Sequence, residues 1–196
     1  ARPFLGEPGA FYWTERRKDF SLEPFTPTIL DRMKTAGFTV FGVGKIEDIF
    51  CFRGLTDSNH THNNNETLAF ISQLIEKDFT GLVFANCIDF DMLYGHRNDV
   101  AGFAKALENV DNWLGENLPR LSEGDILILT GDHGGDPTTA STDHSREYTP
   151  LLILGPGLPE GIDLGTRATF ADIGASIGSW FGLQETGVGK PFEFSI

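Results

Sequence analysis

The alternation of amphipathic segments with short, continuously apolar segments constrains the fold of this chain more than any other feature of its sequence. Nearly every position is apolar or small in four segments, at residues 38–43, 81–87, 125–129 and 151–154. Apolar residues recur at helical spacing in four others, at residues 26–37, 66–77, 100–114 and 170–181. Continuous apolar runs are typical of strands that are covered on both faces. We therefore expect an α/β fold with a mainly parallel sheet that is flanked by helices on both faces.

The first 25 residues do not follow this alternation. They contain three prolines and the basic cluster Arg16-Arg17-Lys18, without sustained periodicity of apolar residues. Segments of this composition are typical of irregular structure and of connectors. We expect residues 1–25 to form a connector and residues 26–196 to form the α/β unit.

The charge balance narrows the range of partners. The chain has 28 acidic and 15 basic residues, which gives a formal net charge of −13 at pH 7. This excess of negative charge repels phosphate backbones and anionic lipids, so we expect neither a nucleic-acid partner nor a membrane partner. No segment has the roughly 20 consecutive apolar residues that span a bilayer, and no secretory leader is recognisable. We therefore expect a cytoplasmic protein.

Residues of the types that bind metals follow two of the expected strands. Asp91 and His96 come shortly after the second strand, and Asp132 and His133 come directly after the third. Because ligands of open α/β sheets lie at the carboxyl ends of the strands, we expect these groups at one edge of the sheet. Taken singly, each motif is also compatible with a helix-capping Asp beside a surface His.

Together with His144, these residues make a set of two carboxylates and three imidazoles. Mixed oxygen and nitrogen ligation suits Mn²⁺, Zn²⁺ or Fe²⁺ better than Ca²⁺ or Mg²⁺. Five ligands exceed the needs of one tetrahedral site, so we expect two divalent ions about 3.5–4 Å apart, as in phosphoryl-transfer centres. His60 and His62 also have the spacing of a metal pair, but they lie among asparagines and are expected on the surface.

Two motifs surround the expected ligands: Thr-Gly-Asp-His-Gly-Gly-Asp-Pro at residues 130–137 and Thr-Asp-His-Ser-Arg-Glu-Tyr-Thr-Pro at residues 142–150. With the stretches 2–9, 44–50 and 89–97, they closely resemble the signature of the phosphopentomutases, members of the alkaline phosphatase superfamily. The resemblance covers nearly the whole chain. It implies the C-terminal part of an alkaline-phosphatase-like core, with the first 25 residues resembling the exit from an inserted cap domain.

The resemblance also implies an activity and its metals. Phosphopentomutases are isomerases of nucleoside catabolism that move phosphate between the C1 and C5 oxygens of ribose or deoxyribose, and the resemblance implies two Mn²⁺ ions, with Zn²⁺ as the alternative. By the same resemblance, Asp91, His96 and His144 hold one ion, and Asp132 and His133 contribute to the other.

Substrate binding and the nucleophile are also implied by resemblance. Lys45, Arg2 and Arg17 would bind the pentose phosphate. The family's reaction uses a phosphorylated threonine and an early Asp ligand, and neither motif occurs in this sequence. A complementary N-terminal segment or chain would have to supply both, so we expect the chain alone to be inactive. Two alternatives remain open: a metal-dependent phosphatase or phosphodiesterase of the same superfamily, and a non-catalytic metal-binding fragment.

Overall fold

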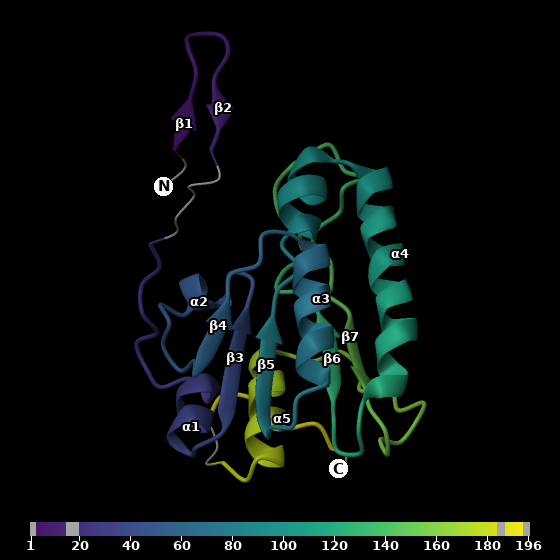
Figure 1. Ribbon diagram of the computed structural model, residues 1–196. Helices are drawn as coiled ribbons and strands as arrows, with labels where there is room; N and C mark the ends of the chain where they lie inside the picture. The colour runs from purple at the N-terminus through teal and green to yellow at the C-terminus, as the bar shows by residue number, and fades with distance from the viewer. Residues whose placement is uncertain (1–2, 15–19, 184–186, 194–196) are drawn as a thin grey trace.

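The computed structural model describes residues 3–14, 20–183 and 187–193 (Figure 1). Within these residues the chain has a parallel sheet flanked by helices, which confirms the predicted α/β fold class. The parallel sheet has the strand order β4-β3-β5, formed by Asp57–Asn59, Thr39–Val43 and Gly81–Ala85. β6 (Leu127–Thr130) and β7 (Leu151–Leu154) form a separate antiparallel pair.

Helices cover both faces of the parallel sheet. α1 (Ile29–Thr35) and α5 (Ala171–Trp180) contact one another, and α1 packs on β3. α3 (Asn64–Ile75) contacts β5, and α4 (Val100–Asn117) contacts α3; Figure 1 shows α3 in front of the sheet and α5 behind it. The buried core joins α1, β3, the short helix α2 (Ile46–Ile49) and α5, and consists of Leu30, Met33, Val40, Ile46, Leu55 and Ile177.

Helix α1 begins at Ile29, inside the range 26–37 that the sequence predicted. Its N-cap is Thr28. The hydroxyl of Thr28 accepts a hydrogen bond from the Asp31 backbone N–H, and the Asp31 carboxylate accepts one from the Thr28 backbone N–H at 2.6 Å. This reciprocal pair satisfies two of the donors that a helix start leaves without partners inside the helix.

The strand register aligns the ends from which the functional loops begin. β3 pairs Val43 with Asn59 of β4 and with Ala85 of β5. Because all three strands are parallel, their carboxyl ends lie at one level of the sheet. The segments that follow β3 and β5 therefore begin side by side, as the backbone N–H of Lys45 shows by donating to Asn86 Oδ1 at 2.8 Å.

Three strands of the described chain have no counterpart in the sequence-based expectations. β4 consists of polar residues that lack any apolar alternation, so its pairing with β3 is not visible in the sequence. The region of the expected connector contains an antiparallel pair, β1 (Phe4–Leu5) and β2 (Tyr12–Trp13), which Figure 1 shows apart from the sheet. Among the described helices none is both long and apolar enough to cross a membrane.

Candidate metal centre

The segment after β5 carries Asp91 and His96 on two tight helical turns. A π-helical turn, η1, spans Phe90–Tyr94, and a 3₁₀ turn, η2, spans Gly95–Arg97. The buried Asp89 anchors their start, because its carboxylate accepts from the Asn64 backbone N–H at 2.8 Å and its own N–H donates to Asn64 Oδ1 at 2.9 Å. The carboxylate of Asp89 is therefore used in structural hydrogen bonds, whereas that of Asp91 is available to bind a metal ion. Single π-turns often occur at functional sites.

The loop between β6 and β7 folds back on itself and brings two histidines together. Ser145 N–H donates to the Gly134 carbonyl at 3.1 Å, and the two residues form an isolated antiparallel bridge. A Cβ on Gly134 would lie 2.6 Å from the Glu147 carbonyl oxygen, so only glycine permits this close approach. The bridge places the imidazole of His133 on that of His144, with ring centroids 3.6 Å apart and planes at 17°.

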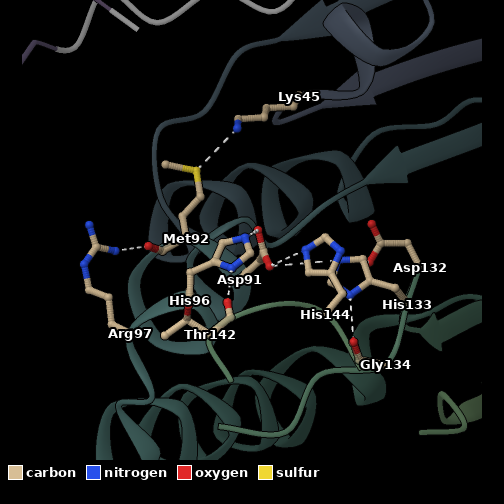
Figure 2. Close-up of polar contacts among 10 residues, drawn as sticks. All are labelled: Lys45, Asp91, Met92, His96, Arg97, Asp132, His133, Gly134, Thr142 and His144. Carbon is tan, nitrogen blue, oxygen red and sulfur yellow. Dashed lines mark hydrogen bonds and ion pairs between the residues drawn. The ribbon is translucent and has the colours of Figure 1, made fainter. Parts of the chain in front are cut away.

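Asp91 lies between histidines from both segments, as Figure 2 shows. Its Oδ1 is 3.2 Å from His144 Nε2, and its Oδ2 is 3.3 Å from His96 Nε2. One ligand atom from each of these three residues lies within 4.8 Å of the others. The rings of His96 and His144 stack with centroids 5.0 Å apart. The structure thus brings together the three residues that the family resemblance assigns to one ion.

Asp132 and His133 lie beside this group without joining it. His133 Nε2 is 3.9 Å from Asp91 Oδ1 and 3.7 Å from Asp132 Oδ1. The side chain of Asp132 is 90% exposed, against 39% for Asp91. Asp132 and His133 therefore form a second, more open pair of donors next to the first group.

Backbone carbonyls set the tautomers of two imidazoles. His96 Nδ1 is 2.6 Å from the Thr142 carbonyl, and His133 Nδ1 is 3.0 Å from the Gly134 carbonyl. A carbonyl only accepts, so each Nδ1 donates to it, which leaves Nε2 as the atom of each ring that can bind a metal ion. Nε2 of His96 lies 3.3 Å from Asp91 Oδ2, a spacing at which both atoms can bind one divalent ion. The donor set fits a divalent metal ion.

The neighbouring thiol does not belong to the donor set. Burial, reinforced by the Asp89 carboxylate, raises the pKa of Cys87 to about 11. Without a bound metal ion the thiol therefore stays protonated at neutral pH, and among the described residues Cys87 is not part of the group of Asp91, His96 and His144. The candidate centre consists of oxygen and nitrogen donors, the combination that suits Mn²⁺ and Zn²⁺.

Lys45 is the one expected substrate-binding residue that the described part of the chain includes. It follows β3, and its Nζ donates to Met92 Sδ at 3.3 Å, beside Asp91 (Figure 2). Arg2 and Arg17 lie outside the described residues. Arg97, which the sequence analysis did not select, donates from Nη1 to the Met92 carbonyl.

Among the described residues, His60 and His62 are not part of the group formed by Asp91, His96 and His144. His60 Nδ1 is 3.0 Å from Glu47 Oε1, and its ring centroid is 5.7 Å from that of His62. The His60 side chain is 41% exposed, in keeping with the expected surface position.

A cavity of about 1270 Å³ borders the centre on the side of Asp132 and His133. It runs along β7 and residues 155–170, and Glu147 and Tyr148 also line it. The open side of the metal-binding residues therefore leads into a large hollow with both polar and apolar walls.

Comparison with known proteins places the chain in a family. The profile of the metalloenzyme superfamily matches residues 39–185, which include all five expected metal ligands. The chain is 52% identical over 192 residues to a phosphopentomutase of Caldanaerobacter subterraneus, with 98% of this chain and 49% of that protein covered. It is 55% identical to a phosphopentomutase of Anaeromyxobacter dehalogenans, with the same two shares covered. The phosphopentomutase of Dictyoglomus thermophilum is 52% identical over the whole chain and half of its own length.

The solved structures add a likeness in fold. The PH0037 protein from Pyrococcus horikoshii superposes with a TM-score of 0.52 at 22% identity, over 64% of this chain and 40% of that one. At this identity the likeness concerns the fold alone. The chain spans about half the length of the curated relatives that it matches.

Proposed function

This chain belongs to the metalloenzyme superfamily, and we propose that it carries the C-terminal share of a phosphopentomutase centre. The proposed reaction moves phosphate between the C1 and C5 oxygens of ribose or deoxyribose. The observation that carries the proposal is the group of Asp91, His96 and His144. It lies in a chain that is about half identical to proteins named phosphopentomutase. Residues 26–196 would be the C-terminal part of the core and residues 1–25 a connector.

The proposed centre holds two divalent ions, Mn²⁺ in preference to Zn²⁺. Asp91, His96 and His144 would hold one ion, and Asp132 with His133 would contribute to the other. When bound, such ions neutralise the negative charge that a phosphoryl group spreads over its oxygens during transfer. The positive charge of the ions also offsets the repulsion between the acidic chain and an anionic substrate.

The other groups of the centre orient the metal-binding imidazoles and supply positive charge for the substrate. The Thr142 and Gly134 carbonyls hold the His96 and His133 rings so that Nε2 of each faces the centre. Lys45 supplies a cation at the same edge of the sheet, beside the turn that carries Asp91. We propose that Lys45 binds the phosphate of the substrate. Arg2 and Arg17 are proposed for the same role on the family resemblance alone.

We further propose that residues outside this sequence complete the centre. Asp91 follows β5 and Asp132 follows β6, and within the described residues these two strands do not pair with each other. Asp132 and His133 make a sparse and open ligand set. A complementary segment or chain that supplies a carboxylate and the threonine nucleophile would complete the second ion's ligands.

Conversion of ribose 1-phosphate to ribose 5-phosphate in the presence of Mn²⁺ tests this function. We expect no robust turnover from residues 1–196 alone and turnover when the missing part is supplied, with His144→Ala inactive in both settings. Robust turnover by the chain alone would refute the need for outside residues. Hydrolysis of p-nitrophenyl phosphate without isomerisation would instead favour a phosphatase or phosphodiesterase.

A further inference from the structure

Asn98 occupies the junction between the turn that carries His96 and the start of α4. Its backbone is left-handed, with φ 52° and ψ 33°. Asn is one of the few residues besides Gly that adopt this conformation readily. Its N–H donates to the Gly95 carbonyl at 3.1 Å, and the next residue, Asp99, caps α4 by accepting from the Gly102 N–H at 2.9 Å. The main chain at Asn98 is therefore held on both sides.

The side chain of Asn98 reaches the loop that carries His144. Its Nδ2 donates to the Thr139 carbonyl at 2.9 Å, across 41 residues of sequence. Because a carbonyl only accepts, this contact determines which way the amide points. Oδ1 of Asn98 is buried and has no hydrogen-bond partner in the part of the chain that the structure describes. A buried acceptor without a partner is unfavourable. The amide of Asn98 therefore stabilises this position through the hydrogen bond that its Nδ2 donates.

A second hydrogen bond joins the same two segments. The Thr142 carbonyl lies 2.6 Å from His96 Nδ1, two residues before His144. The loop is thus attached to the turn at Thr139 and at Thr142, and the attachment at Thr139 does not depend on a metal ligand. Residues 138–144 are exposed and contribute nothing to the buried core, so these two contacts and the Gly134–Ser145 bridge at the base of the loop determine where it lies.

We infer that Asn98 is a positioning residue of the metal centre. Its amide holds the loop of Thr139 against the turn of His96, so that His144 reaches Asp91 with the 3.2 Å separation of the structure. Hydrogen bonds behind the ligands of a metal contribute to affinity in this manner. The inference rests on the proposed function, because it presupposes that Asp91, His96 and His144 bind an ion.

Mn²⁺ titration by isothermal calorimetry on the tag-free protein tests the role of Asn98. Asn98→Gly keeps the left-handed backbone and removes the amide, and Asn98→Asp keeps the shape and replaces the donor by an acceptor. We expect both to weaken Mn²⁺ binding about tenfold, with a Tm in EDTA equal to that of the unaltered protein. Asn112→Asp, at an exposed position of α4, adds the same charge away from the centre and should bind Mn²⁺ normally.

The variant His96→Ala distinguishes a failure of the role proposed for Asn98 from a failure of the proposed metal centre. If His96→Ala abolishes binding and Asn98→Gly binds Mn²⁺ as tightly as the unaltered protein, the role of Asn98 is overturned and the metal centre stands. A loss of affinity in Asn98→Gly that is accompanied by a lower Tm in EDTA also overturns it, because the residue would then act on folding. If His96→Ala binds Mn²⁺ normally, the proposed metal centre itself fails.

Discussion

Replacing Asp91 by Asn removes one charge from the middle of the candidate centre and preserves the shape of the side chain. One carboxylate oxygen faces His144 and the other faces His96. Asn retains a single oxygen and turns the other position into an amide nitrogen, which cannot bind a cation. Asp91→Asn therefore changes the donor set with little change in packing.

The size of the effect follows from the exposure of the carboxylate. Its side chain is 39% exposed, so a dielectric constant near that of water, about 80, gives a lower bound on the attraction. At a metal–oxygen distance of about 2.1 Å, a single charge and a divalent ion attract by about 4 kcal/mol under this assumption. The oxygen that Asn retains recovers part of this energy. We expect Asp91→Asn to weaken Mn²⁺ binding by at least about 100-fold, since 1.4 kcal/mol corresponds to tenfold.

Asp132→Asn is the matched control for the Asp91 substitution. Its carboxylate is 90% exposed and lies outside the group of three, so its loss should weaken binding of the first ion by about 1 kcal/mol or less, which is at most about fivefold. Isothermal calorimetry with Mn²⁺ measures both variants under one buffer condition. Equal losses in the two variants, or Asp91→Asn binding at the affinity of the unaltered protein, would refute the assignment of the first ion to Asp91.

Three further predictions concern stability and reactivity. Burial alone would raise the pKa of Asp31, but hydrogen bonds from Thr28 and Arg53 outweigh it and lower that pKa. Asp31→Asn should therefore destabilise the fold at pH 7 by about 2 kcal/mol, and the difference should fade as the pH drops through the lowered pKa; unchanged urea midpoints at pH 7 would contradict this. Cys87, whose pKa is about 11, should react with iodoacetamide at pH 8 about a hundredfold more slowly than free cysteine, and a free-thiol rate would count against its burial. Met33→Ala, at a position with 0% exposure, should cost about 2–5 kcal/mol in chemical denaturation, and a loss below about 1 kcal/mol would mean that the core is loosely packed there.

The helices and strands that could be predicted are those whose own residues show an apolar run, helical spacing or a capping residue. β7 coincides with the apolar run at residues 151–154, and α4 begins at the predicted Val100 because Asp99 caps it. α4 runs on to Asn117, three residues beyond the predicted end, where a 3₁₀ turn follows it directly. β4 was missed because its polar residues form a strand only through pairing with β3, which is a tertiary effect.

In the candidate site too, some residues could be predicted from the sequence and others depend on tertiary contacts. The strand-end rule and the family resemblance together placed Asp91, His96 and His144 in one group, and the structure brings these residues together. The Thr142 carbonyl and the left-handed Asn98 could not be selected from the sequence, since every residue has a carbonyl and the pairing spans more than 40 positions. The sequence analysis did not single out Asn98; the Asn-Asp dipeptide before α4, of the residue types common in turns, is the one local signal that could have pointed to it.

Anomalous X-ray diffraction from crystals grown with Mn²⁺ tests the central claim most directly. The account predicts an anomalous peak in contact with the Asp91 carboxylate and with Nε2 of both His96 and His144, and a weaker peak, if any, at Asp132 and His133 while the completing residues are absent. A peak elsewhere, or none at the three residues under saturating Mn²⁺, would contradict the claim that this group is a metal-binding site.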